Sequence, residues 1–152
     1  MIRIATDNDI DIICKLRILQ QKEDWKEEHI DELSFYDMTK KFLENHLNKD
    51  LYIFLNIIDS KIAATCGIQI IEYLPQCNDN GRQGYICDVY TLDNYRRMGL
   101  QKDLLKTIIE FSRNKNLCEL NLSSDNEIAI NLYEKIGFEH DKLIMRLELS
   151  NN

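Results

Sequence analysis

The stretch from Tyr85 to Arg113 constrains the fold more than any other part of this sequence. Residues 85–91 are rich in β-branched and aromatic side chains, which is typical of a buried strand. A mainly polar turn follows. From Gly99 onward, leucine and isoleucine recur at helical spacing, at Leu100, Leu104, Leu105, Ile108 and Ile109. A strand, a turn and a long amphipathic helix in this order predict a sheet that is covered by helices.

The rest of the sequence supplies further elements for such a sheet. Strands are predicted at residues 2–5, 51–58, 62–73 and 117–122, at Phe138 and at Leu143 to Leu149. Helices are predicted at residues 7–21, 39–48 and 125–135, with a loop or short helix at residues 22–37 and a loop at residues 75–84. No repeat or linker divides the chain, so we expect a mixed α/β sheet in a single domain over residues 1–152.

The composition limits the classes of function. The formal net charge of -7 argues against nonspecific binding of nucleic acid, because DNA and RNA require a basic surface. The same charge suits a cationic substrate, which an acidic cleft attracts. The five cysteines form no C-x-x-C pair, and their number is odd. We therefore expect neither a metal site nor a disulfide framework.

The sequence also indicates a cellular location. Residues 1–15 carry acids where a secretory signal has a long apolar run. No stretch approaches the roughly 18 apolar residues of a membrane span. Together with the unpaired cysteines, these features predict a soluble protein of the reducing cytoplasm that binds no membrane.

The turn before the helix at residues 99–113 has the features of an anion site. The first N–H groups of a helix lack partners within the helix, and the helix dipole adds positive charge there. Gly99 allows a ligand to approach the backbone, and Arg96 and Arg97 add full charges. The pattern predicts a pyrophosphate cradle, and the alternative is a surface helix start with two solvated arginines.

This turn resembles the acetyl-CoA-binding motif of the GNAT superfamily, Q/R-x-x-G-x-G/A, which follows a strand and opens a helix. The motif here is Arg96-Arg97-Met98-Gly99-Leu100-Gln101. Gln101 departs from the usual glycine or alanine, and its side chain would either crowd the pyrophosphate or bond to it. Downstream, residues 126–138 match the family's N-x-x-A-x-x-x-Y-E-K-x-G-F at every fixed position. The resemblance is clear over residues 84–139. It implies a GNAT-like α/β (α+β) fold, with a mixed, mostly antiparallel central sheet of about six to seven strands flanked by about four helices.

The resemblance implies an N-acetyltransferase that moves the acetyl group of acetyl-CoA directly to an amine, with no metal. It assigns cofactor binding to the backbone of Val89, Tyr90 and Thr91, to residues 96–101, to Asn126 and to Tyr133. Tyr133 would also act as general acid toward the departing thiolate. On their own, residues 89–91 also suit an internal strand, Asn126 a helix start and Tyr133 a packed core position.

The general base is the least certain role. Asp88 lies on the predicted central strand, close to the expected position of the acetyl group, and is the best single candidate. Such a carboxylate needs a raised pKa or a relaying water to take a proton from an amine. Its side chain would instead point away if the strand faced the other way. Tyr85, Glu72 or ordered water are the alternatives, and we expect His29 and His46 at the surface or an interface.

Residues 22–37 combine many acids with aromatic side chains. In the family, the segment between the first two helices usually walls the acceptor site. Acids and aromatics together suit a cationic amine, so Trp25, Glu28 and Tyr36 are the candidate substrate-binding residues. The expected acceptor is a cationic small molecule or a peptide amine, and the alternative is an ordinary solvated acidic face.

Two other readings of the function remain. One is a transferase with a different acyl group or acceptor. The other is a degenerate GNAT domain that binds CoA as a sensor or interaction module without turnover. An apolar edge strand near residues 143–149 would permit a homodimer.

Overall fold

The computed structural model of the chain describes residues 1–25, 31–141 and 144–149. The chain forms two compact units, Met1–Leu122 and Ser123–Asn152, which are described separately below. In the described residues, no helix is long and apolar enough to cross a membrane.

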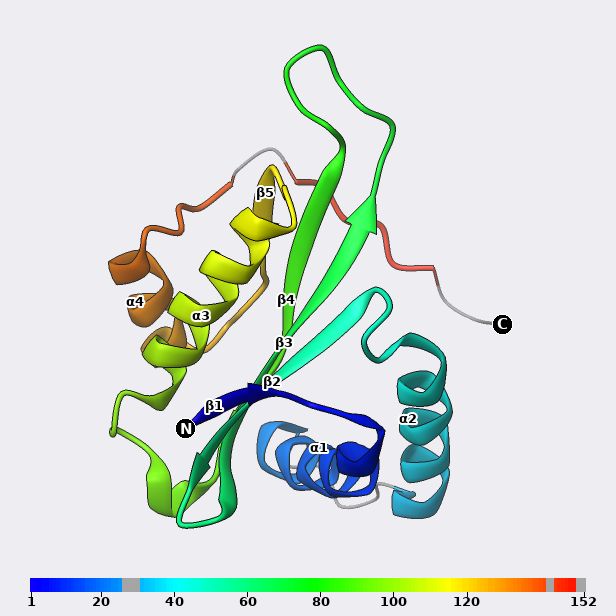
Figure 1. Ribbon diagram of the computed structural model, residues 1–152, viewed down its shortest axis with the longest axis vertical. Coiled ribbons are helices and arrows are strands. Elements are labelled where there is room, and N and C mark those ends of the chain that lie inside the picture. The colour runs from blue at the N-terminus through cyan, green and yellow to red at the C-terminus, as the bar shows by residue number, and fades with distance from the viewer. Residues whose placement is uncertain (26–30, 142–143, 150–152) are drawn as a thin grey trace. The chain divides into compact units, whose positions relative to one another are not determined.

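The first unit contains a five-stranded sheet in the order β1-β2-β3-β4-β5. The strands are β1 (Ile2–Ile4), β2 (Leu51–Ile58), β3 (Lys61–Glu72), β4 (Arg82–Thr91) and β5 (Glu119–Asn121). The first four strands run antiparallel to their neighbours, whereas β5 runs parallel to β4 (Figure 1). The predicted mixed, mostly antiparallel sheet is therefore confirmed, with fewer strands than the expected six or seven.

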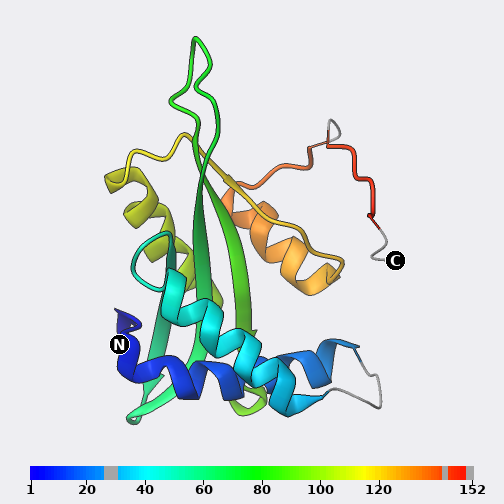
Figure 2. The same cartoon turned by 90° about the vertical axis from the view of Figure 1, so that its right-hand side faces the viewer.

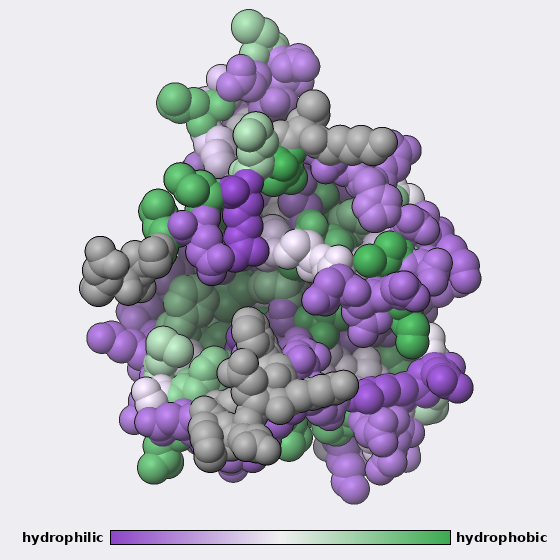
Figure 3. All heavy atoms as spheres, turned by 180° about the vertical axis from the view of Figure 1, so that it is seen from behind, coloured by the Kyte–Doolittle hydropathy of each residue, from purple (hydrophilic) through white to green (hydrophobic). Residues whose placement is uncertain are grey.

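Helices cover both faces of this sheet. Helices α1 (Ile10–Trp25) and α2 (Glu32–His46) lie on one face, and α3 (Leu100–Asn114) lies on the other (Figures 1 and 2). Two short 3-10 turns, Asp7–Asp9 and Asp93–Tyr95, precede α1 and α3. The apolar stripe predicted for α3 is buried against the sheet, with Leu104, Leu105 and Ile108 fully inaccessible. Polar side chains predominate on the surface shown in Figure 3, and exposed apolar ones are scattered among them.

Helix α2 begins earlier than the sequence pattern suggested. Asp31 accepts a hydrogen bond from the backbone N–H of Ser34 at 3.1 Å and so caps a helix that starts at Glu32. Residues 22–25 belong to α1. The segment 22–37, predicted as a loop or short helix, is therefore largely helical where it is described, through the end of α1 and the capped start of α2.

The second unit contains α4 (Glu127–Ile136). Asn126 caps it by accepting from the N–H groups of Ile128 and Ala129 at 3.0 and 3.1 Å. Gly137 ends it in the left-handed region, at φ 115°.

The strands predicted at Phe138 and over residues 143–149 were wrong where the structure describes them. Residues 138–141 and 144–149 form no strand, and residues 142–143 lie outside the described part. A strand needs a neighbour for its backbone groups, and the described residues of this unit offer none. Alternation of apolar side chains was therefore not enough to form one.

Candidate active site

The centre of the candidate site is a bulge in β4. Thr65 pairs with Tyr90 and Gly67 pairs with Cys87, so two residues of β4 lie opposite one residue of β3. Asp88, the first of the two, adopts φ 50°, a left-handed conformation that is rare for a residue other than glycine. Rare backbone conformations are concentrated at functional sites, which makes this bulge the first place to look for chemistry.

Gly67 is the part of β3 that makes room for the bulge. A Cβ atom on Gly67 would lie 3.0 Å from Cys87 Sγ and 3.2 Å from the Cys87 carbonyl oxygen. We expect Gly67→Ala to push the bulge outward and to lower the free energy of unfolding by about 1–3 kcal/mol, as overpacked cores do. Urea unfolding measures the change, and Ala64→Gly on the same strand is the control for altered strand propensity. A fully stable Gly67→Ala protein would contradict this account of the bulge.

Only one of the two carboxylate oxygens of Asp88 accepts a hydrogen bond in the described part of the chain. Its Oδ1 accepts a hydrogen bond from Arg17 Nη1 of α1 at 2.8 Å, and its side chain is 5% exposed. In the described part of the chain, Oδ2 is buried without a hydrogen-bond donor. Burial raises the pKa of Asp88 above the ordinary 3.8, and Arg17 and the Thr65 hydroxyl oppose that rise. The carboxylate thus faces α1 with one oxygen unengaged, as a candidate base requires.

Side-chain donors bind all four carbonyl groups of residues 88–91. Because the bulge interrupts the regular pairing with β3, these groups are available to side chains. Asp88 O accepts from Thr65 Oγ1 at 3.0 Å, Val89 O from Gln20 Nε2 at 3.2 Å, Tyr90 O from Gln101 Nε2 at 2.8 Å, and Thr91 O from Arg96 Nε at 3.1 Å. No sequence signal pointed to Thr65 or Gln20, which are far from β4 along the chain.

The other edge of β4 is open beyond its first residues. β5 pairs with β4 only from Gln83 to Tyr85 and ends at Asn121. Residues 86–91 therefore extend past β5 with no strand beside them on that side in the described chain. The assignment of cofactor binding to the backbone of residues 89–91 stays a prediction.

The turn before α3 forms a concave backbone. Arg97 and Gly99 both have left-handed φ values, 63° and 79°, and Gly99 is the N-cap of α3. No side chain caps this helix start, and a Cβ atom on Gly99 would meet no atom within 4 Å. Met98 is exposed, whereas Leu100 is buried in the core. The unoccupied N–H groups and the open space beside them suit a phosphate group.

Gln101 does not enter this cradle. Its Nε2 donates to the carbonyl oxygens of Thr65 and Tyr90 and to Thr91 Oγ1, at 2.8–3.0 Å. The side chain therefore ties the first turn of α3 to β3 and β4. We expected Gln101 to crowd a pyrophosphate or to bond to one. This orientation of the side chain supports neither effect.

Arg96 is engaged by protein groups. Its guanidinium is paired with Glu23 of α1 and, at 3.2 Å, with Asp93, in addition to the Thr91 carbonyl. Tyr90 donates its hydroxyl to Glu23 at 2.7 Å. Burial and this hydrogen bond raise the pKa of Tyr90 to about 12. Glu23 thus links the end of α1 to β4 and to the turn before α3.

We expect Glu23→Gln to bind acetyl-CoA about two- to fivefold more tightly, because an exposed ion pair is worth up to about 1 kcal/mol. The amide keeps the size of Glu23 and removes the charge that holds Arg96, so the arginine is freer to meet phosphate. Calorimetric titration measures the affinity. Asp93→Asn, which removes a more exposed partner of Arg96, is the control and should change it less. Weaker binding by Glu23→Gln would show that the ion pair instead holds Arg96 ready for the ligand.

The predicted substrate-binding residues are Trp25, Glu28 and Tyr36. Tyr36 lies on α2 and donates its hydroxyl to Asp11 Oδ1 at 2.6 Å, which joins α2 to α1. That hydrogen bond raises the pKa of Tyr36 to about 12. Trp25 ends α1, and Glu28 lies outside the described residues. The predicted role of the three toward an acceptor stays a prediction.

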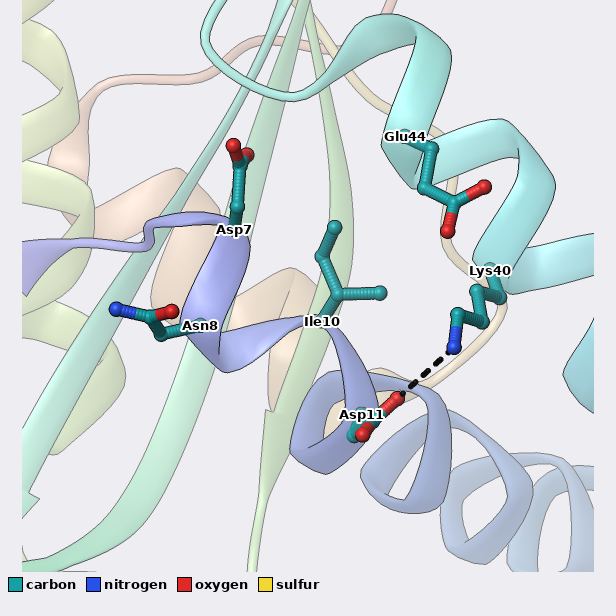
Figure 4. Close-up of a pocket in the computed structure, with 6 residues that line it drawn as sticks. All are labelled: Asp7, Asn8, Ile10, Asp11, Lys40 and Glu44. Atoms are coloured by element: carbon teal, nitrogen blue, oxygen red, sulfur yellow. Dashed lines mark ion pairs between the residues drawn. The ribbon is translucent and has the colours of Figure 1, made fainter.

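A shallow pocket beside this contact contains none of the predicted site residues. Six residues line it, and Lys40 pairs with Asp11 across it at 3.5 Å (Figure 4). The lining consists of Asp7, Asn8, Ile10, Asp11, Lys40 and Glu44, from the 3-10 turn before α1, the start of α1 and α2. It is a polar surface feature rather than part of the bulge.

Two predicted site residues belong to the second unit. Tyr133 is buried within α4, with its ring edge against Phe138 at 5.9 Å between centroids. Asn126 is the N-cap of the same helix, one of the two roles considered for it. Their predicted roles toward a cofactor stay predictions. Within the described ranges, no group of three His, Cys, Asp or Glu residues is placed to hold a metal.

Comparison with known proteins identifies the class of this molecule. A solved structure of a predicted acetyltransferase with acetyl-CoA from Clostridium acetobutylicum superposes with a TM-score of 0.87 at 25% identity, covering 97% of this chain and 95% of that one. An N-alpha-acetyltransferase of Saccharolobus solfataricus is 28% identical over 153 residues, 94% of this chain and 82% of that protein. A glucosamine 6-phosphate N-acetyltransferase of Trypanosoma brucei brucei is 38% identical over 76 residues, about half of each chain.

The fold of this chain is thus that of a predicted acetyltransferase solved with acetyl-CoA. The Acetyltransferase (GNAT) family matches residues 11–138, which is most of the chain. The chain belongs to the GNAT family, and it is an acetyl-CoA-dependent acetyltransferase.

Proposed function

We propose that this protein is an N-acetyltransferase whose acceptor is a cationic small molecule or a peptide amine, and that residues 1–152 act as one domain. The observation that carries the proposal is the bulge of β4. It combines a buried carboxylate with one unengaged oxygen, an open strand edge and a helix start suited to phosphate, all within residues 86–101. The family match runs across both units, which supports a single functional domain.

The residues around the bulge fit acetyl-CoA. The N–H groups at the start of α3, with Arg97 and Gly99, would hold the pyrophosphate. The carbonyls of residues 89–91 are already bound by side chains, so the pantetheine arm would accept hydrogen bonds mainly from backbone N–H groups of the open edge. Acetyl-CoA supplies an acetyl thioester, and a backbone N–H near Val89 would stabilise the oxyanion that develops on its carbonyl.

Asp88 would take the proton that the amine must lose. An ammonium has no lone pair, so the N–H bond must break before nitrogen attacks the thioester carbon. Oδ2 accepts that proton, because Oδ1 is held by Arg17. Burial raises the pKa of Asp88, which brings its basicity closer to that of an amine. The role of Tyr133 as the acid toward the thiolate rests on the family motif alone.

The alternative is a degenerate domain that binds CoA without turnover. One observation favours it, which is that Arg96 is paired with Glu23 and Asp93 rather than free for a phosphate. Such a domain would bind acetyl-CoA and release no thiol with any amine.

The experiment that tests the proposal measures thiol release from acetyl-CoA in the presence of spermidine, glucosamine 6-phosphate, an aminoglycoside and a short peptide with a free N-terminus. Release that depends on one of these amines supports the N-acetyltransferase. Calorimetric binding of acetyl-CoA without release by any of the four supports the sensor. The absence of both contradicts the proposal.

A further inference from the structure

Three buried side-chain oxygens have no hydrogen-bond donor in the described part of the chain. They are Gln20 Oε1, Asp88 Oδ2 and Gln101 Oε1, and all three belong to side chains at the bulge of β4. A buried acceptor without a donor costs about 1–3 kcal/mol, so folded proteins keep very few of them. Their concentration at one short stretch indicates that a donor is brought there by a ligand.

Two of these oxygens lie on the same side of the sheet. Gln20 and Arg17 are three residues apart on α1 and therefore share one face of that helix. Arg17 binds the Asp88 carboxylate, and Gln20 binds the carbonyl of the next residue, Val89. The side chains that carry Gln20 Oε1 and Asp88 Oδ2 therefore meet between α1 and β4. Gln101 contacts β4 from α3 instead.

The orientation of the Gln20 carboxamide is fixed by its partner. Exchanging its nitrogen and oxygen would place Oε1 against the Val89 carbonyl, where two acceptors repel each other. Nε2 must therefore face Val89, and Oε1 must remain an acceptor. Likewise, the hydrogen bond from Arg17 to Oδ1 leaves Oδ2 as the acceptor of the Asp88 carboxylate.

We propose that Gln20 Oε1 and Asp88 Oδ2 together bind the acceptor nitrogen, which makes Gln20 an acceptor-binding residue and Arg17 a positioning residue. This inference rests on the proposed function. Arg17 and Gln20 are only partly buried. The two oxygens themselves are inaccessible, so an amine reaches them only when these side chains of α1 move aside.

An ammonium group supplies the N–H donors that both oxygens lack. A primary ammonium has three, of which two bind the two oxygens. When Asp88 Oδ2 takes one proton, an N–H bond breaks, an O–H bond forms, and the electron pair stays on nitrogen. The neutral amine keeps an N–H on Gln20 Oε1 and turns its lone pair toward the thioester. A quaternary ammonium has the same charge and no N–H group, so it satisfies neither oxygen.

The test is an NMR titration of the full chain with propylammonium, and with tetramethylammonium at equal ionic strength. We expect propylammonium to shift the side-chain resonances of Gln20 and the carboxyl carbon of Asp88, and tetramethylammonium to shift neither. The Gln101 carboxamide should stay unchanged with both. Equal shifts with both cations would mean attraction by charge alone. The absence of any shift would mean that another donor, such as ordered water, satisfies these oxygens. Either outcome overturns the inference.

A pair of matched variants separates binding from stability. Gln20→Leu and Gln101→Leu each remove a hydrogen bond to a carbonyl of β4, so both should lower the melting temperature. Only Gln20→Leu should weaken propylammonium binding, by about tenfold, as expected for a hydrogen bond to a charged group. Unchanged binding by Gln20→Leu would overturn the inference.

Two further measurements complete the test. Arg17→Lys, which keeps a cation for Oδ1, should bind propylammonium better than Arg17→Gln. The amine titration needs no coenzyme, so a failure of acetyl-CoA to bind, which would contradict the proposed function, is seen in a separate measurement.

Discussion

Gly99→Glu is expected to weaken acetyl-CoA binding by more than about 100-fold, the largest effect of any substitution outside the core. Two causes act together. Gly99 adopts φ 79°, which strains other residues, and the space beside it is open. A carboxylate would fill that space at the uncapped start of α3, where it would repel the phosphates and compete for the N–H groups.

Calorimetric titration with acetyl-CoA measures this effect. Gly137→Glu is the matched control, since Gly137 also has a positive φ, 115°, and no atom within 4 Å of a Cβ atom placed there. Both variants should lose similar stability, and only Gly99→Glu should lose the ligand. Gly99→Ala, which adds strain without charge, should lie between the wild type and Gly99→Glu. Undiminished affinity in Gly99→Glu would place the phosphate site elsewhere.

Asp88→Asn is expected to lower the rate constant of acetyl transfer by about 100- to 10,000-fold, the range lost with a general base. The amide keeps the size of the side chain and can still accept from Arg17, but it cannot take a proton. The melting temperature of the variant separates loss of chemistry from loss of fold. Asp59→Asn, in the turn between β2 and β3, is the control and should keep full activity.

The pH dependence of the activity tests the role of Asp88 as the general base independently of the substitution. A base must be deprotonated, so the activity of the wild type should fall as the pH drops through the pKa of Asp88. Because burial raises that pKa, the fall should begin above the range of an exposed aspartate. The groups that act on it are Arg17 of α1, Thr65 and Cys66 of β3, and Cys87 beside it. Asp88→Asn should abolish this acidic limb, and a limb that persists would assign the base to another group.

Local patterns in the sequence predicted the elements that carry the site. The strand before Leu92 and the helix after Gly99 follow from side-chain spacing within one stretch of chain, and both are present. Gly99 was expected to let a ligand approach the backbone, and the structure adds that this glycine adopts a left-handed φ of 79°. Such features depend on neighbours along the chain, which a sequence shows directly.

The contacts that shape the bulge could not be predicted in the same way. Arg17 and Asp88 are 71 residues apart, and Glu23 and Arg96 are 73 apart. Nothing near Asp88 indicates a left-handed backbone, because the bulge arises from the packing of β3 and α1 against it. The strand predicted over residues 143–149 was wrong where it is described for the opposite reason, since its local pattern was suitable and the described residues of its unit offer no partner strand.

The four carbonyls of residues 88–91 receive donors from β3, from α1, from α3 and from the turn before α3. Each donor is a side chain, and each comes from a different element. The shape of this stretch is therefore specified redundantly, and no single substitution removes more than one of its four supports. A substitution of one donor leaves the other three in place, so we expect the backbone of the bulge to keep its course when any one of them is replaced.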